Sequence, residues 1–420
     1  RIMYIMLNRV WTRLIFVSLV LLLAACSTTP YRYEPLDNFE VTKRAITKQQ
    51  GQIQVSASVP SNEEAERILG FPIYKRGIQP VWLEITNNSP NRARFAHVSV
   101  DREYFSPLEV AYMHKKYFSK QGWLDMERYL METAIPRTIP AGETRSGFIY
   151  THAKTGTKSF NVDVFYTGTG DPVYEEFTFF VNVPGFVPDH ATVDWKNLYD
   201  KDAIRDVSVD QLRTELSGLS CCTTNREGSG QGQPVNIVLV ANGIEVLQSL
   251  LRAGWSETSY EKDDNYLNNI EYYFGRPPDA VFRKSRGRNT LTTDRNELSL
   301  WLAPLRNDGT GVWMGQIKHA IGQRYKINEI FFGAAQDPDI DDGRNFLLQN
   351  LWYSQSLLAV AYSNTGLAVP MGNPMLDFND NAFFTDGGRI VMWLSGDPVA
   401  LQDVRNFWWD DEAGFRREEP

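Results

Sequence analysis

Histidine, cysteine and aspartate are the side chains that could support catalysis or metal binding in this chain of 420 residues, which contains five histidines and three cysteines. The histidines are scattered, and no His-Glu-x-x-His segment, the helical spacing of zinc proteases, is present. A Gly-x-Ser-x-Gly segment, which would place a nucleophilic serine on a tight turn, is also missing. The sequence therefore predicts no metal site, no cofactor and no catalytic residue.

The densest group of acidic side chains lies between positions 337 and 342. Its alternate members are Asp337, Asp339 and Asp341. Alternating carboxylates can converge on Ca²⁺, but an EF-hand loop that starts at Asp337 needs Gly at its sixth position and Glu at its twelfth. Those positions hold Asp342 and Leu348. We therefore favour a helix start, in which Asp337 is the N-cap and Pro338 is the first helical residue.

Two of the cysteines are adjacent in sequence, Cys221 and Cys222. Adjacent Cα atoms are about 3.8 Å apart across a trans peptide, which is shorter than the usual disulfide range of about 4.4–6.8 Å. A vicinal disulfide and a buried pair of thiols are both open interpretations. Because no Cys-x-x-Cys segment is present, we do not expect a redox enzyme.

The third cysteine, Cys26, ends the segment Leu23-Ala24-Ala25-Cys26, which resembles the lipobox of bacterial lipoproteins. Arginines precede a short apolar run over residues 14–22, which is the pattern of a secretory signal rather than a spanning helix. We expect residues 1–25 to be the signal peptide and Cys26 to carry the lipid anchor, with diacylglycerol and palmitate-type chains. Ser27, in place of an aspartate, favours the outer membrane, with the protein facing the periplasm.

Composition limits the remaining function classes. The net charge is −8 and no run of lysine and arginine stands out, so a nucleic-acid partner is not expected. Beyond the N-terminal run, no apolar stretch is long enough to cross a bilayer, which excludes a polytopic membrane protein. A chain of this length is expected to form two or three domains of about 100–200 residues each.

Residues 26–50 are polar and predict a tether between the lipid and the first domain. Residues 51–186 contain short β-branched and aromatic segments separated by turns, which predict an immunoglobulin-like β-sandwich. Its expected strands are Val81–Thr86, Phe95–Val100, Gly147–Thr151, Phe160–Tyr166 and Phe177–Val183. A helical insert is expected to begin at the capping box Ser106-Pro107-Leu108-Glu109 and to include a second helix over Asp125–Glu132.

The segment Val183–Pro188 is rich in proline and glycine and predicts a domain boundary. Over residues 195–420, buried-type strands mix with long helices, which indicates an α+β domain. The expected strands are Val235–Ala241, Ser299–Leu302, Val312–Ile317 and Ile390–Leu394. The expected helices lie near Val209–Leu216, after the N-cap Asn242, and from Asp337 towards Gln355.

Six segments of this second half form a pattern together. They are Cys221-Cys222-Thr223-Thr224, Pro234–Val240, Phe274–Asp279, Val312–Gln316, Asp337–Asp341 and Thr385–Gly388. In this order and spacing they resemble the LssY carboxy-terminal domain family over about residues 215–410. In that family the domain also occurs behind membrane phosphatase-type domains, and the resemblance implies no established reaction.

The chain departs from the family pattern at two positions. His319 stands where the pattern has an arginine or a serine-like residue. Ala335-Gln336 stand where the pattern has a histidine, just before the Asp-Pro-Asp segment. Chemistry that depends on that histidine is therefore not carried over to this chain.

Two function classes remain. The first is a non-catalytic envelope lipoprotein that binds or holds a partner, such as an envelope protein, peptidoglycan or an anionic lipid. The second is a hydrolase of cell-wall or lipid substrates, in which Asp279, Asp339 or Asp386 would act as general acid or base. The missing nucleophile and metal motifs favour the first class.

The candidate binding residues lie in the α+β domain and are Arg283, Arg344, Trp313, Gln316 and His319. An arginine fork can bind a carboxylate or phosphate through two parallel hydrogen bonds, although each arginine could instead pair with a nearby acid. Trp313 could belong to the core or form the aromatic floor of a site for an amphipathic ligand. Alternate residues of a strand share a face, so Trp313 and Gln316 are expected on opposite faces.

Overall fold

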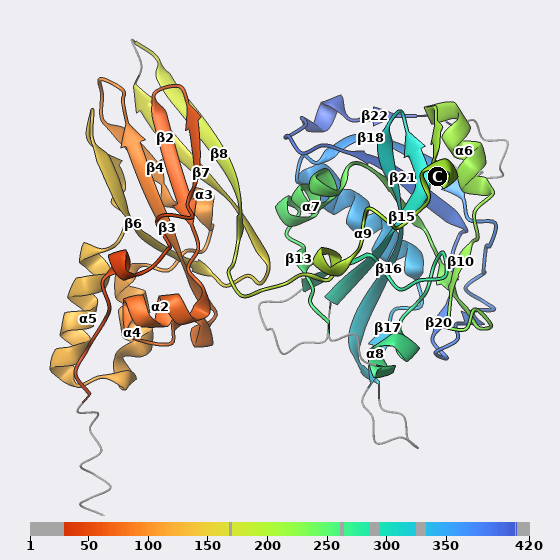
Figure 1. The fold of residues 1–420 in the computed structure, drawn as a ribbon, viewed down its shortest axis with the longest axis horizontal. Coiled ribbons are helices and arrows are strands. Elements are labelled where there is room, and N and C mark those ends of the chain that lie inside the picture. Colours follow the sequence, from red (N-terminus) through yellow and green to blue (C-terminus); the bar gives the residue numbers. More distant parts are fainter. Residues whose placement is uncertain are drawn as a thin grey trace, which may run out of the picture. The chain divides into compact units, whose positions relative to one another are not determined.

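The computed structural model describes residues 29–167, 170–260, 264–285, 295–324, 333–407 and 409. The expected signal peptide and Cys26 lie outside these residues. The chain forms two compact units, Arg1–Lys154 with Phe160–Gly185 and Thr155–Ser159 with Phe186–Pro420. Figure 1 shows sheets and helices in both units, so the expectation of a multi-domain, β-rich chain with helices is confirmed. In the described part of the chain, no helix has both the length and the apolar character needed to cross a bilayer.

The first unit contains two four-stranded sheets. Its strands are β1 (Ile46–Gln50), β2 (Ile53–Ser58), β3 (Ile78–Asn87), β4 (Ala93–Ala96), β5 (Thr138–Ile139), β6 (Thr144–His152), β7 (Thr157–Thr167) and β8 (Pro172–Asn182). One sheet has the order β1-β2-β3-β6 and is antiparallel throughout, and the other has the order β5-β4-β7-β8. Alternate residues of β2 and of β8 lie in the same hydrophobic cluster, so both sheets contribute to one core.

The helices of this unit are α2 (Asn62–Leu69), α3 (His97–Val100), α4 (Pro107–His114) and α5 (Lys120–Glu132), with 3-10 turns η1 (Leu36–Asn38), η2 (Ile73–Arg76) and η3 (Lys115–Tyr117). Helices α2, α4 and α5 bury their apolar residues in a second cluster. The expected capping box of α4 forms, since Ser106 and Glu109 each accept a hydrogen bond from the other's backbone N–H. Helix α2 begins with the same signal, Ser61 and Glu64, and was not expected.

The first unit differs from expectation at two places. Residues 46–50, expected within a polar tether, form the edge strand β1, and Val41 before them is fully buried. The side chains of β1 are exposed, and the strand forms because its backbone pairs with the edge of β2. The expected strand Phe95–Val100 ends at Ala96, because the Ser99 hydroxyl donates to the Ala96 carbonyl (2.7 Å) in a helical turn.

The second unit is built on a ten-stranded mixed sheet. The strands of the unit are β9 (Arg205–Val207), β10 (Cys222–Thr224), β11 (Gln231–Pro234), β12 (Ile237–Val240), β13 (Ser256–Glu257), β14 (Ala280–Ser285), β15 (Arg295–Asn307), β16 (Thr310–Arg324), β17 (Gly333–Gln336), β18 (Leu357–Asn364), β19 (Met375–Leu376), β20 (Ala382–Phe383), β21 (Gly388–Leu394) and β22 (Arg405–Asn406). The main order is β13-β14-β15-β16-β12-β21-β18-β22, with β17 beside β16 and β9 beside β15. Strand β12 is antiparallel to β16 and parallel to β21.

Helices α6 (Val209–Ser217), α7 (Gly243–Arg252) and α9 (Ile340–Tyr353) cover the two faces of this sheet. The unit also contains α8 (Asp264–Asn269) and the 3-10 turns η4 (Asp189–Thr192), η5 (Lys201–Ala203) and η6 (Leu401–Asp403). Alternation along β12 separates two cores: Ile237 and Leu239 pack with residues of α7 and α9, whereas Val238 and Val240 pack with residues of α6. The expected N-cap Asn242 begins α7 and accepts a hydrogen bond from the Glu245 backbone.

Candidate functional site

A pocket with a volume of about 870 Å³ lies in the second unit, where β14, β15 and β16 meet the N-terminal end of α7. Residues between 190 and 204 form another part of its wall. Most of its lining is apolar and includes Trp195, Leu247, Phe282, Leu302 and Trp313. We refer to this cavity as the Trp313 pocket, and its size is within the range of small-molecule sites.

Trp313 is both a core residue and a wall of this pocket. Its side chain is 6% exposed and packs in the cluster under α7 and α9. Its indole Nε1 donates to the carbonyl of Ala241 at 3.0 Å, which fixes the ring. The ring of Trp195, which is 39% exposed, meets it edge-on at 5.6 Å between centroids. The two interpretations of Trp313 as core residue or aromatic floor are therefore compatible.

The charged side chains that line the Trp313 pocket are basic. Lys196, Lys201 and Arg306 are exposed lining residues, and none of them has an ion-pair partner among the described residues. No aspartate or glutamate is among the described lining residues. The N-terminal end of α7 also faces the cavity through Asn242 and Gly243, and the helix dipole there favours an anion. An anionic group at the mouth of an apolar cavity would match this arrangement.

The histidine in this lining is already engaged. His190 Nε2 lies 2.7 Å from the Oε1 of Glu257, whose carboxylate is buried. Burial alone would raise the pKa of Glu257, but hydrogen bonds from His190 and from the backbone of Thr157 outweigh burial and hold the pKa below its usual range. The pair therefore fixes the chain at the pocket wall.

Of the three candidate residues on β16, Gln316 and Trp313 point to opposite faces, as the strand period predicts. The Nε2 of Gln316 donates to the carbonyl of Gln233 at 3.0 Å and to the hydroxyl of Thr223 at 3.3 Å. Gln316 is 2% exposed and belongs to the face that carries β10 and β11. It cannot share a site with Trp313, whose side chain faces the other core.

Both candidate arginines bind carboxylates of their own chain. Arg283 donates from Nε to Glu297 Oε2 at 2.7 Å and lies over the ring of Tyr260. Arg344 forms a bidentate pair with Asp386, with both N–O distances at 2.8 Å, and also donates to the carbonyl of Gly388. An external anion would have to displace these partners, so the arginine forks serve the fold.

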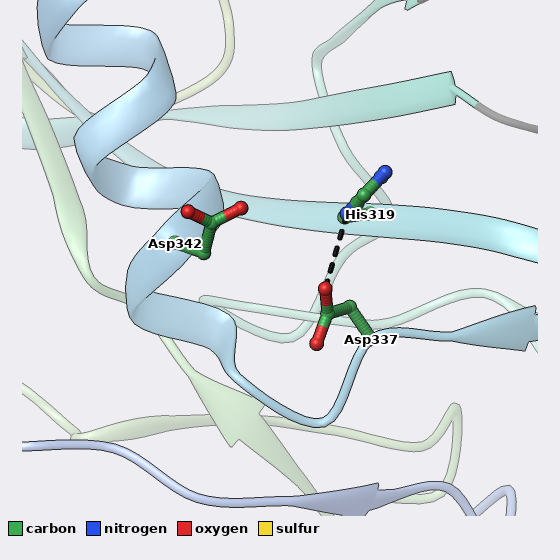
Figure 2. Close-up of side chains that lie close together, drawn as sticks. All are labelled: His319, Asp337 and Asp342. Carbon is green, nitrogen blue, oxygen red and sulfur yellow. Dashed lines mark hydrogen bonds and ion pairs between the residues drawn. The ribbon is translucent and has the colours of Figure 1, made fainter.

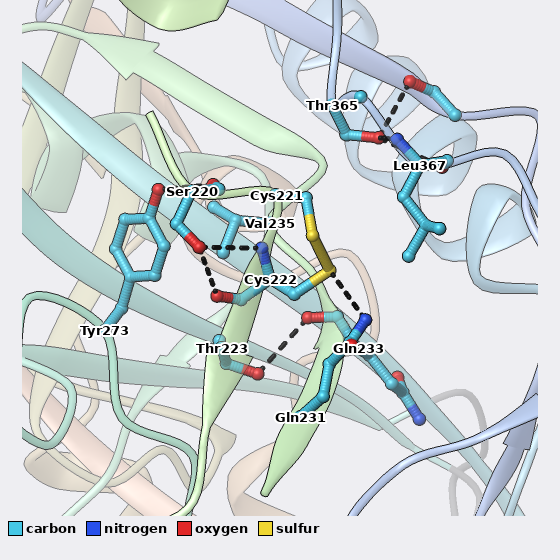
Figure 3. The surroundings of a disulfide bond; sticks show 12 residues. Ser220, Cys221, Cys222, Thr223, Gln231, Gln233, Val235, Tyr273, Thr365 and Leu367 are labelled. Atoms are coloured by element: carbon cyan, nitrogen blue, oxygen red, sulfur yellow. Dashed lines mark hydrogen bonds between the residues drawn. A yellow bond between two sulfur atoms is a disulfide. The ribbon is translucent and has the colours of Figure 1, made fainter. Parts of the chain in front are cut away.

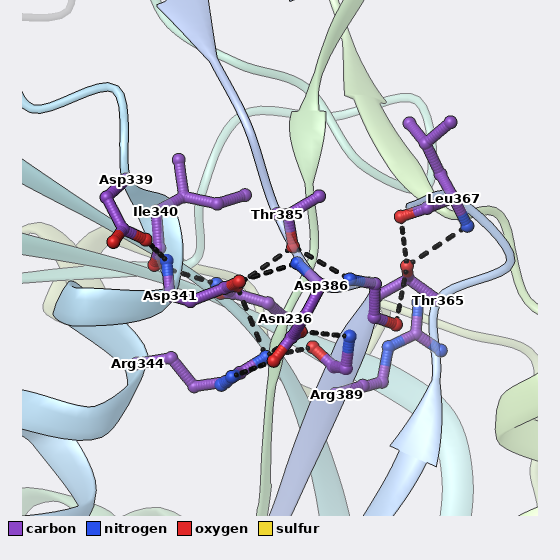
Figure 4. A network of polar contacts seen from close by, with 12 residues as sticks. Asn236, Asp339, Ile340, Asp341, Arg344, Thr365, Leu367, Thr385, Asp386 and Arg389 are labelled. Atoms are coloured by element: carbon purple, nitrogen blue, oxygen red, sulfur yellow. Dashed lines mark hydrogen bonds and ion pairs between the residues drawn. The ribbon is translucent and has the colours of Figure 1, made fainter. Parts of the chain in front are cut away.

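Figure 4 shows that Arg344 is the centre of a polar network at the start of α9. Asp341 accepts from the hydroxyl of Thr385 at 2.8 Å and from the backbone N–H of Asp386 at 2.6 Å. Burial alone would raise the pKa of Asp386, but the hydrogen bonds from Arg344 outweigh burial and lower it. The network joins α9 to the loop before β21.

His319 lies at the far end of β16 and faces two aspartates. Its Nδ1 is 3.3 Å from Oδ2 of Asp337, which follows β17. Asp342 lies in the first turn of α9. One possible ligand atom from each of the three side chains lies within 4.8 Å of the other two. Figure 2 shows that the three side chains come from a strand, a loop and a helix.

The start of α9 differs from the predicted one. Its N-cap is Asp339, whose carboxylate accepts from the Asp341 backbone, and Ile340 is the first helical residue. Asp337 instead accepts from the backbone N–H of Asp339 at 3.1 Å, in an Asx turn before the helix. The other carboxylate oxygen of Asp337 is thereby left to face His319.

Cys221 and Cys222 form a vicinal disulfide, the first of the two open interpretations (Figure 3). The loop around it is held by several contacts: the hydroxyl of Tyr273 donates to the carbonyl of Ser220, and the carbonyl of Cys221 accepts from the backbone of Val235. Cys222 is 4% exposed and lies beside β11. The disulfide lies where the chain enters β10, which pairs with β11.

The three carboxylates considered for acid–base catalysis do not line the Trp313 pocket. Asp279 forms a bidentate pair with Arg276 and accepts from the backbone of Leu302. Asp339 caps α9, and Asp386 pairs with Arg344. Each of these carboxylates is therefore held by the fold, with its partner in the same unit.

Several residues of these two regions were not expected from sequence. Lys196, Lys201 and Arg306 come together only through the folded chain, and no spacing rule links them. Asn296 pairs with His319 across β15 and β16, a register that composition does not encode. Asp342 had a signal, because it lies in the run of aspartates, but its partner His319 lies on another element.

A protein-family model matches the second half of the chain. No curated protein matches the chain. The family model described as the LssY C-terminus matches residues 213–388, which include the Arg344 network, the vicinal disulfide, His319 and Trp313. The resemblance inferred from the order of the six sequence segments is thereby confirmed over residues 213–388, which match the LssY C-terminal family.

Proposed function

We propose that this protein is a lipid-anchored protein of the bacterial cell envelope that binds an amphipathic anion in the Trp313 pocket without catalysing a reaction. The anchor would be Cys26, and the protein would face the periplasm from the outer membrane. The observation that carries the binding proposal is the combination of an apolar cavity with a positively charged mouth. No pair of buried carboxylates lines this cavity in the described residues, which favours binding over hydrolysis.

The chemistry of the pocket supports a lipid more than a glycan. Apolar side chains such as Leu247, Phe282 and Leu302 lose water when an acyl chain covers them, and burial contributes about 25 cal/mol per Å² of apolar surface. Lys196, Lys201 and Arg306 would then neutralise the phosphate or carboxylate of the head group. Peptidoglycan carries acidic groups but few long apolar chains. It would therefore pair with the basic residues at the mouth and leave the apolar wall of the pocket uncovered.

The first unit would hold the binding unit away from the membrane surface. We propose that its two sheets form an immunoglobulin-like sandwich, which is supported by the single core to which residues of both sheets contribute. Such a module would serve as a spacer along the chain between the anchor and the binding unit.

The pocket can be tested with the full chain held in phosphatidylcholine nanodiscs. Dihexanoyl-phosphatidylglycerol is expected to bind more tightly than dihexanoyl-phosphatidylcholine, as measured by calorimetry with the heat of empty nanodiscs subtracted. Lys196→Gln and Arg306→Gln should each weaken phosphatidylglycerol binding by about 2- to 5-fold, because an exposed ion pair contributes about 0.2–1 kcal/mol. Trp195→Ala should weaken both lipids, since it removes apolar wall.

The matched control is Arg94→Gln, which removes an exposed arginine of β4 and should leave lipid binding unchanged. Equal affinity for the two lipids would remove the role of the charged mouth. Binding of soluble muropeptides with no binding of either lipid would replace the lipid by a glycan. Binding of none of the three would end the proposal.

The anchor gives a second test. Wild-type protein should partition into the detergent phase of Triton X-114, whereas Cys26→Ala should stay in the aqueous phase. Each buried CH₂ of an acyl chain contributes about 0.8 kcal/mol, so a protein with several acyl chains stays bound to the membrane. A protein without acyl chains lacks this contribution. If both proteins partition into the detergent phase, Cys26 is not the anchor.

A further inference from the structure

A polar row crosses the sheet of the second unit under α9. On β14, β15 and β16, Lys284 pairs with Asn296 and Asn296 pairs with His319. Residues that face each other across antiparallel strands have Cβ atoms about 4.5–5.5 Å apart and point to the same face. Asp337 continues the row, because its backbone N–H donates to the carbonyl of His319 at 2.8 Å. Further along the same strands, Phe282, Leu298 and Ile317 of this face belong to the hydrophobic core.

Helix α9 brings a second carboxylate onto this row. Gly343 allows the close approach, since a Cβ there would lie 3.1 Å from Cγ2 of Ile317 on β16. Ile317 and His319 are alternate residues of one strand, so the helix turn that covers Ile317 also carries Asp342 towards His319.

Asn296 is the unexplained member of the row. Its side chain is fully buried, and neither its Nδ2 nor its Oδ1 has a hydrogen-bond partner among the described residues. A buried amide without partners costs about 1–3 kcal/mol, so a ligand that it could reach would relieve that cost. Across the strand pair, the residue that it faces is His319.

The distance between two of the three ligand atoms fits a shared cation. Two atoms that each lie about 2.0–2.2 Å from a tetrahedral cation are ~3.3–3.6 Å from each other. His319 Nδ1 and Asp337 Oδ2 are 3.3 Å apart, which is longer than the usual N–H···O distance. An oxygen of the Asp342 carboxylate lies within 4.8 Å of both of these atoms.

We propose that His319, Asp337 and Asp342 bind a divalent transition-metal cation, with the Asn296 carbonyl oxygen as the fourth ligand. Imidazole favours zinc-like cations over Mg²⁺ and Ca²⁺, and two carboxylates neutralise the charge of the ion. His319 is 6% exposed, whereas Asp342 is exposed, so the cation can enter from the helix side. The nearest cation in the row, Lys284, directs its Nζ to the carbonyl of Ala253 at 2.6 Å.

This site is separate from the Trp313 pocket. His319 and Trp313 lie on the same face of β16 and are ~20 Å apart, because a strand rises about 3.3 Å per residue. The metal proposal therefore stands or fails independently of lipid binding.

The test uses the full chain in non-ionic detergent, stripped with EDTA and free of a polyhistidine tag. One Zn²⁺ per chain is expected by mass spectrometry of metal content after dialysis, and Co²⁺ should give the visible absorption of a four-coordinate site. Loss of a residue that supports a metal ligand typically weakens binding by about 10- to 100-fold, so His319→Ala and Asp342→Asn should weaken it at least that much. Asn296→Leu should weaken Zn²⁺ binding while keeping or raising the melting temperature of the metal-free protein, since it removes the unpaired amide.

Asp339→Asn is the matched control, because it removes one charge from the same helix start while an asparagine still caps α9. It should bind Zn²⁺ like the wild type. The proposal is overturned if the wild type retains no Zn²⁺, if Asp342→Asn binds as tightly as Asp339→Asn, or if Mg²⁺ and Ca²⁺ compete with Zn²⁺ on equal terms. Circular dichroism of each variant verifies that it is folded.

Discussion

Replacing Arg344 with methionine is expected to lower the free energy of unfolding of the second unit by about 3 kcal/mol. Removing one partner of a buried ion pair costs about 3–5 kcal/mol, because the other charge stays buried and unpaired. The lower end applies, since the side chain of Asp386 is 42% exposed and water can reach it, whereas that of Asp341 is 14% exposed. The measurement is guanidinium unfolding followed by circular dichroism.

A matched arginine of the same unit, Arg283 on β14, separates this effect from a general loss of charge. Arg283→Met breaks the pair with Glu297, in which the side chains are 34% and 29% exposed. Such pairs contribute about 0–1 kcal/mol, so this variant should be nearly as stable as the wild type. The double change Arg344→Met with Asp386→Asn should recover part of the loss. Equal losses for Arg344→Met and Arg283→Met would contradict the role of the network.

Local signals in the sequence predict the elements of this chain well. The strand Val235–Ala241 is rich in β-branched residues, and the residues Ile237–Val240 within it pair on both sides as a central strand should. Helices α4 and α7 begin at the side chains that cap them, because the capping contacts are local in sequence. The strand period also placed Trp313 and Gln316 on opposite faces of β16.

Features that depend on residues distant in the sequence could not be predicted from the sequence. The expected strand Ser299–Leu302 continues to Asn307 past Pro304, because a register shift between Leu302 and Arg306 accommodates the missing N–H of proline. The start of α9 was predicted at the wrong aspartate, because Asp337 and Asp339 are both good N-caps. Asp339 caps the helix, whereas Asp337 contacts His319.

The candidate sites depend on tertiary structure for the same reason. The Trp313 pocket combines residues near 195, 242, 282 and 313, and the His319 group combines a strand, a loop and a helix. No local pattern links these positions, so composition and spacing could name Trp313 and His319 but not their partners. The pairing register of β15 with β16 is the missing information in both cases, since it aligns Trp313 with Leu302 and His319 with Asn296.

Replacing Trp301 with alanine is expected to lower the free energy of unfolding of the second unit by about 3–5 kcal/mol, the usual cost of removing a buried aromatic side chain. Trp301 is fully buried on the face of β15 that packs with α6, and the ring of Tyr273 lies edge-on at 6.0 Å. Its Nε1 donates to the carbonyl of Arg276 at 3.1 Å, and without the indole this carbonyl still accepts from the backbone N–H of Tyr273 at 3.0 Å, so the loss of packing accounts for most of the expected cost.

Trp352→Ala is the control, since Trp352 lies on α9, is 39% exposed, and donates only to the carbonyl of Leu401 at 3.2 Å. Its loss should cost about 1 kcal/mol or less, as for other partly exposed positions away from the core. Trp301→Phe should lie between the two, because the ring volume is largely kept while the N–H is lost. If Trp301→Ala and Trp352→Ala unfold at the same guanidinium concentration, the α6 face of the sheet is not a packed core, and the two-sided architecture that holds Trp313 and His319 on the opposite face is wrong.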